Sequence, residues 1–534
     1  MKNKKLNKIV LILFYFVLPL MFLKIDYRFI ETFNCCQDDH DYYSHAETIA
    51  IDFDLNYDNQ FVGFETERYN NNGKVAPKGF IGTGIFSSPF LFIGNLFESL
   101  FNFSNNIFNL RIAIYSLSSI FYFYLSIFLM TKVFDLLNIN FNPNLIFIIF
   151  FGSGISYFAF ERYSMSHVYE AFSITLIIYL TVNFYKETGN NKNYYSILIP
   201  LATLLSFSVR WVNYFIFFIP LIIKLLFNEK LLTKNQILKN KYFYISYGIS
   251  TLLFQYLNHL TYGMITFNPE DIYGKSNRLY TFFNNDIGIL FSKVTNSIYV
   301  ILVSPEFGII WFSPIIFCSL FLLTRYIFVK KDMNNYLQHI FVLFIYLIPF
   351  GIVTVWQSTA SSYGFRYLYS LVPISVLIFG KYYESNNKGL ISKYVIFFSV
   401  FSMLSILFFE TSDTTSLRNN INSFGSNDRF SQPEYLFGLF NSFGDLNAYL
   451  KIFVTSFIGV IIFKIFSILF GMDKFIEYLD TFGLPVDNLD FQNFVYQIQN
   501  IELIKITIFT SLFLLIIFRF YKLNKNQNSV LNLK

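Results

Sequence analysis

Long apolar runs alternate with short polar connectors along almost the whole chain. A helix needs roughly 20 mostly apolar residues to cross the hydrocarbon core of a bilayer, and most of these runs approach that length. The pattern therefore predicts an all-α, multi-pass membrane protein with about 13 transmembrane helices. The expected spans are 9–23, 109–130, 144–160, 168–185, 194–209, 211–227, 243–260, 308–327, 337–356, 366–383, 392–410, 452–470 and 503–521.

Lysines give the expected orientation of these spans. They recur in the connectors near 186–192, 230–241, 330–331 and 388–393, and short loops rich in Lys and Arg stay on the cytoplasmic side. The N-terminus is also basic, and no small-x-small cleavage site follows its apolar run, so we expect a retained first helix with a cytoplasmic start. The outer face then carries the loops 24–108, 161–167, 261–305, 357–365 and 411–451.

Two stretches complicate this topology. The segment "FIGTGIFSSPFLFIGNLFESLF" within 80–103 contains three Gly and one Pro, which predicts an interfacial or re-entrant helix pair rather than a full crossing. Thirteen crossings would also place the basic C-terminus outside. Either one late span does not cross, or residues 471–502 contain a further element. We divide the chain into a module 1–375 and additional helices 376–534.

Composition narrows the class of protein. The chain of 534 residues is 54% hydrophobic and only 14% charged, whereas a soluble domain carries about 25% charged residues. The net charge of +6 is explained by the lysines of the connectors, so it is not a signal for nucleic acid. Three cysteines are too few for a disulfide framework.

The densest acidic cluster follows the first span directly. The segment "CCQDDHDYYSHAE" (35–47) contains Asp38, Asp39 and Asp41. One interpretation is a solvated loop. The alternative is a general base for a hydroxyl group, because the cluster leaves the membrane beside "AETIAIDFDLNYDN", which resembles an amphipathic helix lying along its surface. We favour the second interpretation.

Three further outer segments carry polar residues. The short loop "ERYSMSH" contains Glu161, Arg162 and His167; a loop tethered by two helices is a stiff platform for a site, although these residues also suit helix ends. Lys78 lies beside flexible glycines and either binds a phosphate or extends to lipid headgroups. Arg366 stands where a helix begins, which is typical of an anion site but also of an anchor to lipid headgroups. Trp356, Tyr363 and Tyr367 surround it and favour the anion site.

The order of these motifs resembles the GT-C glycosyltransferases, the membrane enzymes related to protein O-mannosyltransferases and bacterial aminoarabinose transferases. Asp38, Asp39, Tyr42 and Ala46 follow the family's opening "D-E-x-x-Y-x-x-x-A". The segments "PKGFIGTGIFSSP", "ERYSMSH", "SPEFGIIWFSP" and "SSYGFRYLYSLVP" resemble its later motifs over the first 375 residues.

The resemblance implies an inverting transfer of a sugar from a polyprenyl-phosphate donor to a glycan, lipid or protein of the cell envelope. The reaction would occur on the outer face of the bacterial cytoplasmic (inner) membrane. Asp38, with Asp39 beside it, corresponds to the catalytic position. The residues implied for substrate or phosphate binding are Lys78, Arg162, Arg366, Tyr42 and Tyr363.

The resemblance also raises the question of a divalent metal, Mg or Mn, because some members use one; Glu161 and His167 are the candidate ligands. Two alternatives to an enzyme of this kind stay open. A transporter or flippase of lipid-linked saccharides should bury ionisable residues within its helices. A polymerase of the O-antigen type should concentrate Arg and His in late outer loops.

Overall fold

The structure is a computed structural model that describes residues 8–23, 37–63, 68–69, 72–101, 109–232, 236–268, 271–272, 278–305, 307–329, 333–356, 363–385, 389–409, 440, 443–481 and 500–531. These residues form helices and connecting turns without a strand, and an isolated bridge joins Tyr69 and Val75. The predicted all-α class is therefore confirmed for the described part of the chain. Residues 411–439 of the predicted outer loop 411–451 lie outside it.

Within the described residues, six helices are long and apolar enough to cross a membrane, which indicates a membrane protein. This is fewer than the expected number of spans. They comprise α5 (Ile81–Phe101), α6 (Leu110–Leu136), α9 (His167–Lys186) and segments of α18 (Met333–Trp356), α20 (Leu390–Phe409) and α27 (Leu503–Leu531). Shorter apolar helices are Lys8–Phe22, which contains η1 (Leu13–Val17) and α2 (Leu18–Phe22), and α15 (Ile287–Leu302), α17 (Pro314–Val329) and α24 (Phe457–Phe470).

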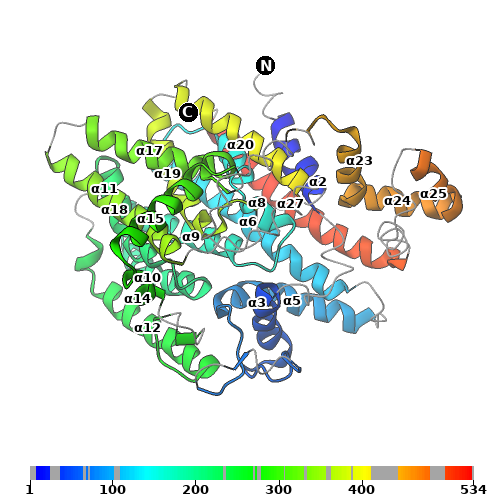
Figure 1. Cartoon of the computed structure of the whole chain (residues 1–534), viewed down its shortest axis with the longest axis horizontal. Coiled ribbons are helices and arrows are strands. Elements are labelled where there is room, and N and C mark those ends of the chain that lie inside the picture. Colours follow the sequence, from blue (N-terminus) through cyan, green and yellow to red (C-terminus); the bar gives the residue numbers. More distant parts are fainter. Residues whose placement is uncertain are drawn as a thin grey trace.

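Helix α6 lies near the centre of the bundle (Figure 1) and packs against α5, α9 and α27. Its Tyr124 donates a hydrogen bond of 2.6 Å to the carbonyl of Phe14 in the first helix. The remaining elements surround this core. They are α3 (Gln37–Glu47), η4 (Thr48–Asp52), α10 (Asn191–Val209), η6 (Asn228–Lys230), η7 (Ile237–Lys239), α12 (Lys241–Tyr262), α14 (Arg278–Phe283), α23 (Leu446–Thr455) and α25 (Met472–Thr481).

Local sequence explains where several helices begin. Asn109 precedes α6, and its side chain accepts a hydrogen bond from the backbone N–H of Ile112. Asn240 does the same for α12, which ends at Gly263 with φ of 72°. Asparagine is a strong N-cap because its side-chain oxygen replaces a missing helical acceptor, and glycine tolerates the left-handed conformation that closes a helix.

Five expected spans are each divided into two helices, which corrects the hydropathy-based prediction. Their parts are α7 (Pro143–Phe151) and α8 (Ile155–Phe160), η5 (Tyr214–Phe218) and α11 (Ile219–Phe227), α16 (Ile309–Phe312) and α17, η8 (Arg366–Leu371) and α19 (Val372–Ser385), and α23 and α24. Pro220, Pro314 and Pro373 stand in the first turn of the second helix. Proline lacks the N–H that would continue the preceding helix. Mean hydropathy does not depend on this property, so it does not predict the helix break.

The stretch 80–103 is also corrected, because α5 is one continuous helix with Pro89 inside it. Its glycines allow close packing and do not break the helix. A Cβ atom on Gly84 would lie 2.4 Å from Cβ of His45, and one on Gly82 would lie 2.4 Å from the backbone nitrogen of Val209. The glycines therefore let α3 and the end of α10 approach α5 directly.

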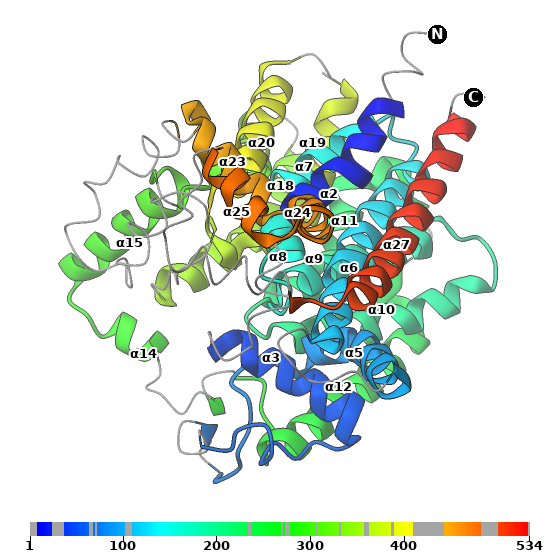
Figure 2. The ribbon, with the colours of Figure 1, turned by 90° about the vertical axis from the view of Figure 1, so that its right-hand side faces the viewer.

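The first helix and the C-terminal part of α27 lie at the same end of the molecule, opposite α3 (Figure 2). Helix α27 returns along the first helix, where Asn524 donates a hydrogen bond to the hydroxyl of Tyr15. Both features named in the two explanations for the C-terminus are present: residues 452–470 are divided between α23 and α24, and α25 lies within 471–502.

Candidate functional site

Helix α3 presents two buried aspartates that anchor it to the rest of the protein. Asp39 accepts hydrogen bonds from the guanidinium of Arg162 and from the hydroxyl of Ser164. Asp41 accepts a 2.8 Å bond from Nε of Arg68. Both carboxylates are buried, and a buried carboxylate is stable only when such donors replace its lost water. These two aspartates therefore fix the position of α3.

The third aspartate of α3 is exposed and meets an arginine from much later in the chain. Asp38 has a side chain that is 57% exposed, and its Oδ2 lies 3.1 Å from Nη2 of Arg366, whose own side chain is only 8% exposed. The two residues are 328 positions apart. Nε of Arg366 is buried and has no hydrogen-bond partner among the described residues. One N–H donor of this arginine is thus left unpaired within the described part of the chain.

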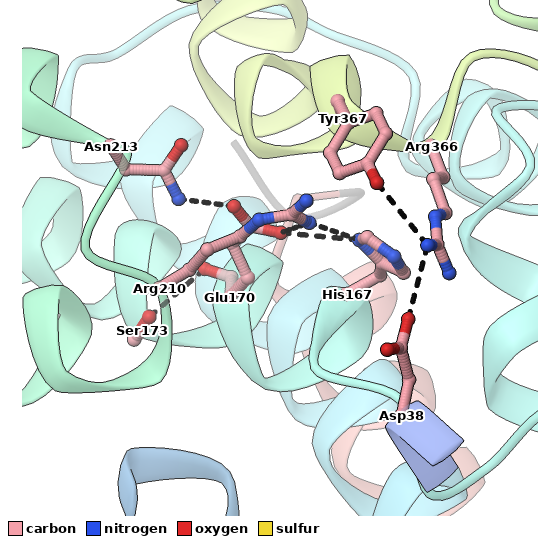
Figure 3. Close-up of polar contacts among 8 residues, drawn as sticks. All are labelled: Asp38, His167, Glu170, Ser173, Arg210, Asn213, Arg366 and Tyr367. Atoms are coloured by element: carbon pink, nitrogen blue, oxygen red, sulfur yellow. Dashed lines mark hydrogen bonds and ion pairs between the residues drawn. The ribbon is translucent and has the colours of Figure 1, made fainter. Parts of the chain in front are cut away.

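Tyr367 links this pair to a second arginine (Figure 3). Nη2 of Arg366 donates to the hydroxyl of Tyr367 at 3.3 Å, and its guanidinium carbon lies 5.1 Å from the centre of that ring. The guanidinium carbon of Arg210 lies 4.6 Å from the same ring centre. An aromatic face attracts cations, most strongly away from water. One aromatic ring therefore holds two guanidinium groups in the same small region.

Arg210 is itself held by a buried polar cluster (Figure 3). Its Nη1 lies 3.0 Å from Nδ1 of His167 and 3.5 Å from Oε2 of Glu170. The amide of Asn213 donates a further hydrogen bond to Oε1 of Glu170. Arg210 stands where α10 has ended and the backbone is extended, with φ of −157°. The break between α10 and η5 is therefore what places the guanidinium here.

Tyr42 completes the cluster from α3. Burial raises the pKa of its hydroxyl to about 12, and Arg210 and Arg366 act in the opposite direction. The hydroxyl also hydrogen-bonds the side chain of Ser166. Tyr42 is thus a neutral hydroxyl near physiological pH that lies close to both arginines and to Asp38.

Lys78 lies beside α3 because its backbone is fixed there. Its N–H donates a 3.1 Å hydrogen bond to Oδ2 of Asp41. The following residue, Gly79, accepts a 2.9 Å bond at its carbonyl from Tyr262, and a Cβ on Gly79 would lie 2.9 Å from the ring of Tyr42. The half-exposed Lys78 is therefore attached to the same helix that presents Asp38.

Two predicted roles are not brought into this cluster. Tyr363 is buried, and its hydroxyl hydrogen-bonds Ser402 on α20 at 2.9 Å, so it takes part in helix packing. Of the metal candidates, Glu161 is buried, and Nδ1 of His167 faces the cationic Arg210, which disfavours a metal ion at that nitrogen. In the described ranges, groups of three or more His, Cys, Asp or Glu with metal-binding geometry are absent.

Sequence reasoning placed Tyr367 beside Arg366 but did not include Arg210 or Glu170 in the site. One signal was available: Arg210 is the single residue between the expected spans 194–209 and 211–227. The predicted topology places that connector on the outer face, together with Asp38 and Arg366. Taken together, the site combines an exposed carboxylate with two arginines that retain free donors, and this arrangement can hold an anion next to a base.

Comparison with known proteins gives no match for this chain, whether against protein-family models, curated proteins or solved structures.

Proposed function

We propose that this protein is a membrane glycosyltransferase of the GT-C type, which transfers a sugar from a polyprenyl-phosphate donor to a hydroxyl group of a cell-envelope glycan, lipid or protein. The reaction would take place on the outer face of a bacterial cytoplasmic membrane, with inversion at the anomeric carbon. The observation that carries the proposal is the pairing of exposed Asp38 with buried Arg366 beside Arg210. A carboxylate and an anion site lie together, as transfer from a phosphate donor requires.

The proposed reaction is a single displacement. A carboxylate oxygen of Asp38 accepts the proton of the acceptor hydroxyl, and the acceptor oxygen forms a bond to the anomeric carbon. The bond from that carbon to the phosphate oxygen breaks, and its electron pair stays on the phosphate. The donor phosphate is a diester with one negative charge, and the leaving phosphate gains a second.

Arg366 is suited to stabilise this developing charge. It pairs with Asp38 in the absence of substrate, and protonation of Asp38 during the reaction removes the negative charge from that partner. The guanidinium can then interact more strongly with the departing phosphate. Stabilisation of charge that appears in the transition state is usually the largest single contribution to catalysis. Lys78 and the hydroxyl of Tyr42 would supply additional contacts to the donor.

One observation favours a second candidate, a transporter of lipid-linked saccharides. Glu170 and Arg210 form a buried charged pair at the start of α9 and the end of α10, and buried ionisable residues within a membrane often line a transport pathway. A transporter does not need the exposed carboxylate of Asp38, so activity that depends on this residue separates the two candidates.

The direct test uses the purified full chain in nanodiscs with a panel of radiolabelled polyprenyl-phosphate sugars. We expect release of polyprenyl phosphate, and Asp38→Asn should slow it by about 10²–10⁴-fold because a general base is lost. Asp58→Asn is the matched control, since Asp58 is an exposed aspartate in the segment after α3. Equal release by wild type and Asp38→Asn would refute the mechanism. Passage of the intact donor across the membrane without release would favour the transporter.

A further inference from the structure

Glu170 is a carboxylate that the proposed reaction does not use directly. Its side chain is almost fully buried, and it is held by Arg210 and by the amide of Asn213. Removing two charges from water costs several kcal/mol per ion, so a buried pair contributes little net stability compared with apolar packing. Stability alone is therefore a weak reason for an ion pair at this position.

The bonds of Arg210 point to another purpose. The contacts it makes to Glu170 and His167 both use Nη1. Within the described residues, its Nη2 and Nε have no hydrogen-bond acceptor. These atoms are also not completely buried by protein, so a ligand can reach them. An arginine that is fixed through one nitrogen and open at the others matches the two-point recognition of a phosphate.

The orientation of Arg210 also relates it to Arg366. Both guanidinium groups approach the ring of Tyr367, at 4.6 and 5.1 Å from its centre, and Nε of Arg366 is likewise without an acceptor in the described part of the chain. His167 lies between Glu170 on one side and Arg366 on the other (Figure 3). The two arginines thus offer unused N–H donors around one ring.

We propose that Glu170 is a positioning residue: it fixes Arg210 so that this arginine and Arg366 together bind the phosphate of the donor. This inference rests on the proposed function for the identity of the phosphate compound. Glu170 does not touch the substrate. It orients Arg210 and offsets part of its charge while the site is empty, so that the buried guanidinium is tolerated before the phosphate arrives.

A double-mutant cycle on phosphate binding tests this role, because coupling between two residues appears as non-additivity. The affinity of a polyprenyl monophosphate for the full chain in nanodiscs is measured for wild type, Glu170→Gln, Arg210→Gln and the double variant. We expect Arg210→Gln to weaken binding about tenfold in the presence of Glu170, as for the loss of a charged hydrogen-bond donor. In the Glu170→Gln background the same change should cost less than about threefold, because a loosened Arg210 no longer contributes fully.

Three controls separate positioning from simple damage to the fold. Polyprenol, which lacks the phosphate, should bind all four proteins equally. Glu384→Gln breaks an ion pair with Lys230. Lys230 also contacts Asn138, which follows the end of α6 that is distant from α3. This variant should therefore leave phosphate affinity unchanged. Asn213→Ala removes one donor to Glu170 and keeps both charges. It should shift phosphate affinity in the same direction as Glu170→Gln by a smaller factor. If Glu170→Gln does not fold, Asn213→Ala replaces it in the test.

The outcomes are distinct for the two proposals. Additive effects of Glu170→Gln and Arg210→Gln, or equal losses for polyprenol and polyprenyl phosphate, would overturn the positioning role even if the enzyme transfers sugar. Coupled losses that are specific for the phosphate would support it, even if wild type shows no transfer and the glycosyltransferase proposal fails. Absence of any phosphate-dependent binding by wild type would overturn the inference. Inorganic phosphate, tested in parallel, shows whether the lipid chain is required.

Discussion

Helix α3 carries three aspartates in two opposite settings. Asp38 is exposed and meets a single arginine, whereas Asp39 and Asp41 are buried and each accept two hydrogen bonds. A carboxylate whose oxygens are occupied by internal donors cannot take a proton from a substrate without breaking the fold. The difference teaches that burial and the number of internal partners, more than position in the acidic run, separate the candidate base from the anchors.

The largest expected effects come from replacing Asp38, which should reduce activity, and Asp39, which should reduce stability. Asp38→Asn should abolish most transfer and lower stability by less than Asp39→Asn does, because Asp38 itself is 57% exposed, although its partner Arg366 is buried. Asp39→Asn should lower the free energy of unfolding by about 3–5 kcal/mol, because Arg162 and Ser164 lose the charge that they solvate. Thermal unfolding in detergent and release of polyprenyl phosphate are measured on both variants. A stable Asp39→Asn protein without activity would reverse the assignment of base and anchor.

A smaller effect is expected where α5 packs against α3, at Gly84. Gly84→Ala should lower the free energy of unfolding by about 1–3 kcal/mol, since the added methyl group overlaps the backbone and side chain of His45. Gly248 in α12 is the matched control, because a Cβ there meets nothing within 4 Å. Gly248→Ala should be neutral or stabilise by up to about 1 kcal/mol through helix propensity. Equal results for both variants would show that α3 does not rest on α5 as described.

The carboxyl group of Asp41, which is buried on α3, should make stability depend on pH. Burial raises the pKa of Asp41 from 3.8 to about 7, against the opposing effect of Arg68. The folded state then keeps a proton that the unfolded chain has lost, so the contribution of Asp41 to stability is complete below pH 3.8 and is lost as the pH rises through about 7. Asp38 also faces this group and raises its pKa, while the N–H of Lys78 lowers it.

The measurement is the difference in unfolding midpoint between wild type and Asp41→Asn as a function of pH. Wild type should lose stability relative to the variant between about pH 4 and pH 7, since unfolding releases a proton from Asp41 in this interval and the variant has no such proton. Burial lowers the pKa of His45 to about 4, but this histidine is common to both proteins and cancels in the difference. A relative gain for wild type over that range would mean that the ion pair with Arg68 outweighs burial.

The smallest effect is expected at Tyr363. Tyr363→Phe removes one buried hydrogen bond to Ser402 and should cost about 0.5–1.5 kcal/mol of stability. The KM for the donor should not change, because the hydroxyl points into the packing of α20 and away from the arginines. A rise in KM together with unchanged unfolding would restore Tyr363 to the substrate-binding residues.

Much of the helical content could be predicted from the sequence, because apolar runs and cap residues are local signals. The helix breaks could not, since they depend on prolines in a first turn and on tertiary contacts. Gly154 shows this: a Cβ there would lie 2.1 Å from the hydroxyl of Tyr369, a residue on η8. The continuity of α5 was missed for a related reason, as its glycines were interpreted as breaks and serve close packing instead.

The candidate site divides in a similar way. Asp38 and Arg366 were both singled out by the sequence, and the structure brings them together. Glu170 and Arg210 were not paired in advance, because they are 40 positions apart on two helices whose relative rotation is set by packing. Tyr367 was noted beside Arg366 in the sequence, but its contact with the second guanidinium group, that of Arg210, is seen only in the structure.

The central claim is that α3 and η8 form one phosphate-binding site around Asp38. The most direct measurement is a cryo-electron microscopy structure of the full chain in nanodiscs with a polyprenyl monophosphate. Our account predicts density for the phosphate within hydrogen-bond distance of Arg366 and Arg210, next to the carboxylate of Asp38. A phosphate bound elsewhere, with the Asp38–Arg366 pair unchanged, would contradict it.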